Sequence, residues 1–127
     1  MIARRWVPPI AWAAIILTLN SVPDPDMGGL RLPGLDKLIH ATLYGILGWL
    51  CARAVTRSAP APAPPSPRTW WLAVFAGILI LGALDEWHQR FVPGRSTELY
   101  DWIADGTGAL VGMLAAALTR RAGAQYS

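Results

Sequence analysis

Four apolar segments separated by polar stretches dominate the pattern of hydrophobic positions along the chain. They cover roughly residues 7–19, 38–55, 70–84 and 99–118. A helix needs about 20 residues to cross the hydrocarbon of a membrane. The second and fourth segments reach that length with their polar ends, and the first and third do so when extended to Asn20 and to about Phe91. The pattern therefore predicts four membrane-spanning helices, at residues 6–20, 36–55, 69–91 and 97–119.

The fold class follows from what a membrane tolerates. Open sheet edges are not stable in lipid and four strands cannot close a barrel, so the segments must be helices. We expect an all-α integral membrane protein, a bundle of four transmembrane helices forming one domain over residues 1–127. Pro8 and Pro9 then fall in the first turn of the first helix, where a missing N–H costs little. A Pro/Ala-rich linker at 58–68 joins the second and third helices.

Composition supports a membrane protein. Of the 127 residues, 54% are hydrophobic, only 15% are charged and seven are tryptophan. A water-soluble domain of this size would leave much apolar surface exposed. The single cysteine, Cys51, excludes an internal disulfide.

The charges predict the orientation. With four spans, no acidic residue falls on the side of the two termini, whereas all acids and both histidines fall on the other side. The basic residues on the side of the termini are Arg4, Arg5, Arg53, Arg57, Arg68, Arg120 and Arg121. By the positive-inside rule, both termini and the linker are cytoplasmic. The chain after Arg120 is expected to be disordered.

Polar residues gather at the predicted outer ends of the helices. Five of the eight acidic residues lie between Ala83 and Gly106. Helical spacing places the polar residues of each segment on one face, and about two turns of helix separate the deepest of them from the outer loops. The aligned residues are Asp36, His40 and Tyr44; Asp85, Glu86 and Gln89; and Asp101 and Asp105, with Gly108 and Gly112 below them. This pattern predicts one outward-facing polar pocket.

The residue types indicate two roles. The candidates for general acid–base chemistry are His40, Asp85, Glu86, Asp101 and Asp105. The candidates for ligand binding are Asp36, Lys37, His40, Tyr44, Gln89, Arg95 and Ser96. The alternative is structural: Asp85–Arg95 or Glu86–Lys37 ion pairs that lock the helices. The histidines and carboxylates cluster, but they lack the spacing of a metal-binding motif, so the sequence predicts no metal ligands and no cofactor.

Several motifs together resemble the VanZ-like family. They are Ser21-Val22-Pro23, Asp36-Lys37-Leu38-Ile39-His40 with Tyr44, Asp85-Glu86-Trp87-His88-Gln89, Pro93-Gly94-Arg95-Ser96, and Asp101 and Ala104-Asp105 with Gly108 and Gly112. The resemblance implies a small multi-pass protein of the bacterial inner membrane. The family's namesake is associated with resistance to the glycopeptide teicoplanin, and the resemblance implies no particular biochemical activity.

Two functional hypotheses remain open at this point. In the first, the pocket binds or alters access to a lipid or cell-wall component, as a factor in glycopeptide resistance. In the second, the protein is an intramembrane enzyme acting on a lipid-linked envelope substrate; an ion-coupled transporter is less favoured. The expected partners are membrane lipids, a lipid-linked cell-wall precursor or a glycopeptide, and further copies of the chain. The arginines are spread as topology signals, which argues against nucleic acid as a partner.

Overall fold

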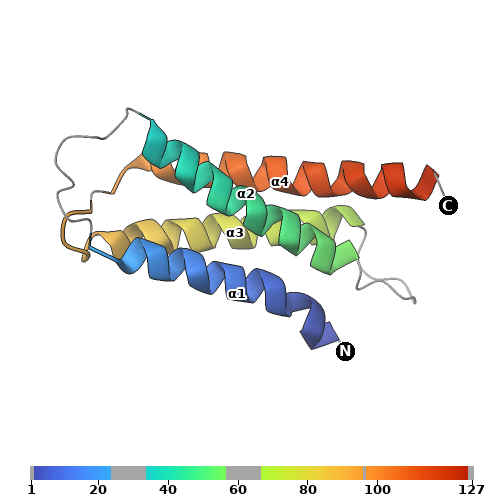
Figure 1. Cartoon of the computed structure of the whole chain (residues 1–127), viewed down its shortest axis with the longest axis horizontal. Helices are drawn as coiled ribbons and strands as arrows, with labels where there is room; N and C mark the ends of the chain where they lie inside the picture. The colour runs from blue at the N-terminus through green and yellow to red at the C-terminus, as the bar shows by residue number, and fades with distance from the viewer. Residues whose placement is uncertain (1, 24–33, 57–66, 96, 126–127) are drawn as a thin grey trace.

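The computed structural model describes residues 2–23, 34–56, 67–95 and 97–125, and all its regular elements are α-helices. In chain order they are α1 (Ile2–Ser21), α2 (Leu35–Thr56), α3 (Pro67–Gln89) and α4 (Leu99–Gln125). Figure 1 shows each helix running antiparallel to the next, with the N- and C-termini at the same end. Helix α2 contacts each of the other three helices. The all-helical part of the predicted fold is confirmed.

Three of the helices are long and apolar enough to cross a membrane. These stretches are Leu35–Thr56, Arg68–Gln89 and Leu99–Gly123. Helix α1 has 20 residues and is not among them. It nevertheless packs along α2 and α3. The chain is therefore a membrane-type helical protein.

The helix ends differ from the predicted ones in ways that local chemistry explains. Helix α1 already begins at Ile2, so Pro8 and Pro9 lie inside the helix and not in its first turn. Helix α3 ends at Gln89 because a tight turn follows, in which the Arg95 N–H donates to the Val92 carbonyl at 3.2 Å. Gly94 in this turn has a φ of 77°, a conformation that favours glycine.

Helix α4 is longer than predicted. It continues to Gln125, so the expected disorder after Arg120 is not seen over this stretch. Alanine and arginine in the last turns are good helix formers, which is consistent with the extension.

Charged residues are segregated between the two ends of the bundle. The described arginines at the end that holds the termini (Figure 1) are Arg4, Arg5, Arg53, Arg68, Arg120 and Arg121. The described acids lie near the opposite ends of the helices, at Asp36, Asp85, Glu86, Glu98, Asp101 and Asp105. Arg57 lies outside the described residues.

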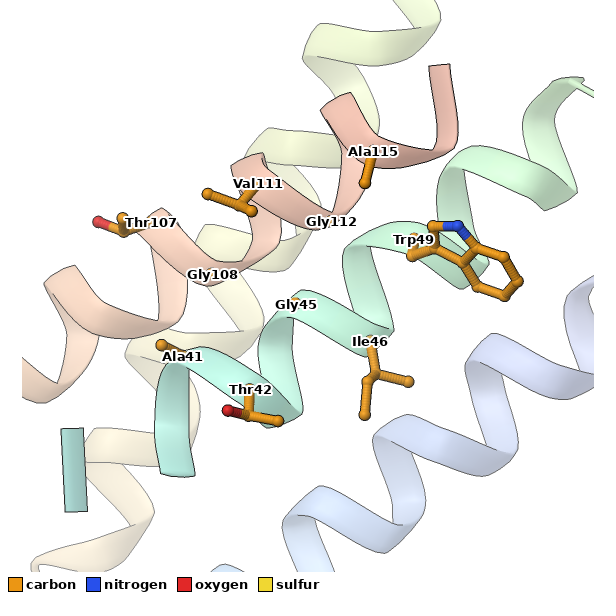
Figure 2. A pocket seen from close by; sticks show the side chains of 10 residues that line it. All are labelled: Ala41, Thr42, Gly45, Ile46, Trp49, Thr107, Gly108, Val111, Gly112 and Ala115. Carbon is orange, nitrogen blue, oxygen red and sulfur yellow. The ribbon is translucent and has the colours of Figure 1, made fainter. Parts of the chain in front are cut away.

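Helices α2 and α4 make the closest approach in the bundle, and glycines make it possible. A Cβ on Gly108 would overlap the carbonyl oxygen of Ala41, and one on Gly112 would overlap that of Gly45. Figure 2 shows Gly108 and Gly112 of α4 on the side that faces Gly45 of α2. Small residues allow this kind of backbone contact between membrane helices. The crossing holds α2 and α4 close together just below the acidic ends of the two helices.

Two tryptophans set how the helices lie along one another. The indole N–H of Trp12 on α1 donates to the Leu43 carbonyl of α2 at 2.9 Å. The indole N–H of Trp102 on α4 donates to the Leu79 carbonyl of α3, also at 2.9 Å. These bonds join pairs of helices in one register, which brings the polar residues of all four helices to the same end.

Candidate functional site

Each of the four helices contributes buried polar side chains to the end of the bundle opposite the termini. We call this group the buried polar cluster. It consists of Asn20 from α1, His40 and Tyr44 from α2, Asp85, Glu86 and Gln89 from α3, and Asp101 and Asp105 from α4. None of these side chains is more than 8% exposed. The structure thus brings all five acid–base candidates and three of the ligand-binding candidates, His40, Tyr44 and Gln89, into one place.

Asp85 joins three helices. The amide nitrogen Nδ2 of Asn20 donates to Asp85 Oδ2. The hydroxyl of Tyr44 donates to the same oxygen at 3.3 Å. The sequence pattern did not indicate Asn20 as a site residue. The available signal was a polar amide in the last turn of an otherwise apolar segment, at the depth of Asp85.

His40 and Asp105 form a second contact in the cluster, between α2 and α4. Their atoms Nδ1 and Oδ1 are 2.8 Å apart and share a hydrogen bond. Gly108 lies one turn below Asp105, at the point where α4 touches the backbone of α2. The close crossing therefore brings the carboxylate within reach of the imidazole.

Glu86 and its neighbours are only partly satisfied. Glu86 Oε2 accepts a hydrogen bond of 3.4 Å from the backbone N–H of Glu98, just before α4 begins. Within the described part of the chain, Glu86 Oε1, Gln89 Nε2 and Asp105 Oδ2 are buried without a hydrogen-bond partner. Leaving one such group unpaired costs roughly 1–3 kcal/mol. These three atoms can still form hydrogen bonds.

Lys37 neutralises the acids at the rim of the cluster. Its ammonium lies 2.7 Å from Glu98 Oε2, 3.0 Å from Asp36 Oδ2 and 3.1 Å from Asp101 Oδ1. The sequence had suggested Glu86 as its partner, and the structure pairs it with these three acids instead. Asp101 is buried whereas Asp36 and Glu98 are exposed, so Lys37 bridges the buried polar cluster and the surface.

Arg95 has a structural contact that the sequence did not predict. Its Nε donates to the Val22 carbonyl at 3.2 Å and its Nη2 to the Leu19 carbonyl at 3.3 Å. These carbonyls lie at and just beyond the end of α1, and that of Leu19 also accepts the Val22 N–H at 3.3 Å. Arg95 therefore ties the α3–α4 turn to α1 and forms no described ion pair with Asp85. Ser96, the last ligand-binding candidate, lies outside the described residues.

Three residues of the cluster have the donor types of a metal site. One ligand atom each from His40, Glu86 and Asp105 lies within 4.8 Å of the others. The side chains of Asp36, Glu98 and Asp101 meet the same condition, but Lys37 contacts all three of them. The two groups differ in burial, since the first is wholly buried and the second is mostly exposed.

The described residues also form apolar grooves outside the cluster. One, of about 580 Å³, lies along the α2–α4 crossing and is lined by residues such as Ala41, Trp49 and Val111 (Figure 2). The other, of about 400 Å³, lies between α1, α2 and α3 and is lined by residues such as Trp6 and Trp70. Neither groove is lined by a residue of the buried polar cluster, so neither is the predicted polar pocket.

Comparison with known protein families returns a match over nearly the whole chain. The family model described as VanZ/LLP1 matches residues 5–120. This range contains every residue of the buried polar cluster. No curated protein and no solved structure matches the chain.

Proposed function

The chain belongs to the VanZ-like family, and from this membership and the buried polar cluster we propose that it binds a component of the bacterial cell envelope. The binding site is the outer end of the bundle, and the ligand is the polar headgroup of a lipid-linked cell-wall precursor. Binding at this site alters the access of a glycopeptide such as teicoplanin to its target. The protein lies in the inner membrane.

The proposed topology has four spans with both termini in the cytoplasm. Three helices have the length and apolarity of membrane spans. The support for α1 as the fourth is its packing against α2 and α3. The arginine-rich end then faces the cytoplasm, as the positive-inside rule requires. The buried polar cluster consequently lies near the outer face, at the level of the lipid headgroups.

The observation that carries the proposal is that three buried polar atoms of the cluster have no hydrogen-bond partner among the described residues. Glu86 Oε1 and Asp105 Oδ2 can accept hydrogen bonds, and Gln89 Nε2 can donate them. Ionisable groups inside a membrane are costly, and they commonly mark functional sites. A headgroup with hydroxyl, amide or amine groups offers partners to both acceptors and to the donor.

Residues at the rim supply a path for such a headgroup. Lys37, Asp36 and Glu98 surround the outer side of Asp101 with polar groups. The Lys37 ammonium can exchange a carboxylate for a phosphate oxygen of the lipid. The lipid tails stay beside the helices, where exposed apolar side chains such as Leu38 and Ile103 face outward.

The test is equilibrium binding with the purified full chain in lipid nanodiscs. A fluorescent lipid-linked cell-wall precursor is titrated against wild type, Glu86→Gln and Gln89→Leu, with phosphatidylglycerol as the competing lipid. We expect each variant to bind the precursor at least tenfold more weakly, and His88→Asn to bind like wild type, since His88 is exposed. Equal affinity in all four folded proteins, or no preference over phosphatidylglycerol, contradicts the proposal.

A second candidate, an enzyme acting on a lipid-linked substrate, is favoured by one contact. The Asp105 carboxylate holds the His40 ring by Nδ1 at 2.8 Å, an arrangement that orients an imidazole for proton transfer. Incubating the nanodiscs with the precursor and analysing the lipids by mass spectrometry separates the two functions. An enzyme gives a product with wild type that Asp105→Asn does not form, whereas a binding protein returns the precursor unchanged.

A further inference from the structure

His40, Glu86 and Asp105 have the arrangement of a metal site, and we propose that they bind one divalent transition-metal ion. The three residues come from α2, α3 and α4, and all are buried. One ligand atom from each lies within 4.8 Å of the other two. The residues are 46 and 19 positions apart in the sequence, so local spacing could not reveal them. This inference goes beyond the proposed function, because the ion would hold Glu86 Oε1 and Asp105 Oδ2 and a headgroup would then reach the cluster through the ion and Gln89 Nε2. It does not require that a headgroup binds.

The donor set selects the class of ion. One imidazole nitrogen and two carboxylate oxygens suit Zn²⁺, Mn²⁺ or Fe²⁺, whereas Ca²⁺ and Mg²⁺ prefer oxygen ligands alone. At bond lengths near 2.1 Å, two ligands of a tetrahedral ion are separated by about 3.4 Å. Ligand atoms that already lie within 4.8 Å of one another reach this spacing by small side-chain rotations.

Unpaired oxygens provide an independent observation. Glu86 and Asp105 are 8% and 2% exposed, and Glu86 Oε1 and Asp105 Oδ2 have no hydrogen-bond partner in the described part of the chain. Buried carboxylate oxygens are normally satisfied by donors. A cation satisfies both at once.

The charge balance points in the same direction. Asp85, Glu86 and Asp105 lie together in the interior. Over the described residues, none of them forms an ion pair with lysine or arginine, and His40 is the one basic partner, at Asp105. Buried charges without compensation strongly destabilise a protein. A divalent ion supplies two positive charges where the chain supplies at most one.

The outer acidic group shows what a compensated cluster looks like in the same protein. One ligand atom each from Asp36, Glu98 and Asp101 also lies within 4.8 Å of the others. The Lys37 ammonium contacts all three, at 2.7–3.1 Å. This group already has its cation, and it therefore serves as an internal control for metal binding.

A bound ion would change what the site can do. Three protein ligands leave one or more coordination positions open, as in catalytic zinc sites. An open position accepts water or an oxygen of a phosphate or carboxylate. The metal thus gives an acidic cluster an affinity for anionic groups that its carboxylates alone would repel.

The experiment measures metal directly. The full chain is purified in detergent with a tag that contains no histidine and without chelator, and its metals are quantified by elemental mass spectrometry. After stripping, Co²⁺ is titrated while its visible absorption is followed, and Zn²⁺ competes for the site. We expect one ion per chain, and at least tenfold weaker binding in Glu86→Gln and Asp105→Asn. Metal restored to the stripped protein should raise its unfolding temperature.

Two variants control for charge and for histidine. Glu98→Gln removes an acid of the outer group and His88→Asn removes the exposed histidine, and both should keep wild-type affinity. Circular dichroism and gel filtration establish that each variant folds. If Asp105→Asn does not fold, wild type and His40→Gln are compared by the Co²⁺ spectrum and by Mn²⁺ paramagnetic resonance with nitrogen coupling. Wild type that binds no more metal than Glu86→Gln, or equal losses in Glu98→Gln, overturns the proposal.

Discussion

His40 on α2 and Asp105 on α4 are joined by a buried contact of 2.8 Å between Nδ1 and Oδ1, although 65 positions separate them in the sequence. The glycine crossing below them makes this possible, because Gly45 and Gly108 allow the two backbones to touch. The geometry of the site therefore depends on glycines, which have no reactive side chain of their own.

Adding one methyl group at the crossing should destabilise the bundle. In Gly112→Ala the new Cβ overlaps the carbonyl oxygen of Gly45, and overpacking of this kind costs about 1–3 kcal/mol. Unfolding in mixed detergent micelles with increasing sodium dodecyl sulfate measures the difference. Gly77→Ala is the matched control, since nothing lies within 4 Å of its Cβ position. Equal stability of both variants would contradict the close crossing.

The Asp85 contacts should hold both α1 and α2 against α3. Asn20→Leu and Tyr44→Phe each remove one donor to Asp85 Oδ2. Hydrogen bonds between membrane helices average about 0.6 kcal/mol and reach about 1.7 kcal/mol. We expect Asn20→Leu at the upper end of this range, and Tyr44→Phe near the average because its bond is longer. Double-mutant cycles with Asp85→Asn measure both couplings, and zero coupling for both would refute the network.

Removal of Lys37 should destabilise the protein through Asp101. Lys37→Met takes away the ammonium that lies 3.1 Å from the buried Asp101 carboxylate. A buried acid without its partner favours unfolding, so the melting temperature in detergent should fall. Asp101→Asn in the same chain should restore much of the loss, since it removes the orphaned charge. If the double variant is no more stable than Lys37→Met, this pair does not stabilise the fold.

Arg95 should act on the position of α1 rather than on ligand binding. Arg95→Gln removes the donors to the Leu19 and Val22 carbonyls. Spin labels on the exposed residues Leu17 and Leu84, introduced as cysteines in a Cys51→Ala background, report the distance between α1 and α3. We expect a broader distance distribution in Arg95→Gln, whereas Arg90→Gln should leave it unchanged. A selective loss of headgroup binding with an unchanged distribution would instead make Arg95 a ligand contact.

Topology can be mapped by labelling single cysteines in intact spheroplasts. In the Cys51→Ala background, Glu98→Cys should react with a membrane-impermeant maleimide from outside. Arg4→Cys and Arg121→Cys should react only after lysis, because both ends of the chain are proposed to be cytoplasmic. Arg4→Cys is the sharper test, since α1 is not one of the three helices with the length and apolarity of a span. Labelling of Arg4→Cys without lysis would place the N-terminus outside.

Much of the fold could be predicted from the hydrophobic pattern. Four apolar segments predicted four helices, and the structure has four over its described residues. Helical spacing placed Gly108 and Gly112 below Asp105, and these are the residues at which α4 meets the backbone of α2. The ends of the helices were harder to predict. Pro8 and Pro9 appeared to start a helix, but a proline kept inside a helix is tolerated when neighbouring groups satisfy the freed backbone.

Only part of the site could be predicted from the sequence. Helical spacing grouped Asp85 with Gln89 and His40 with Tyr44, because residues four apart share a face. Spacing within one helix does not say which residue of another helix it meets. For that reason the sequence suggested ion pairs between Arg95 and Asp85 and between Lys37 and Glu86. In the structure, Arg95 donates hydrogen bonds to carbonyls at the end of α1, and Lys37 forms ion pairs with the acids at the rim of the cluster.

The sequence by itself determined a helical membrane protein with its acids gathered toward one end, because apolar length and the placement of charge are local properties of the chain. The tertiary structure alone decided the partners: Asn20 and Tyr44 at Asp85, Asp105 at His40, and two carboxylate oxygens left unpaired beside that histidine. These contacts depend on the rotation and axial shift of each helix against its neighbours. Glycine contacts and tryptophan hydrogen bonds between helices set this rotation and this shift. The sequence of one helix alone predicts neither of them.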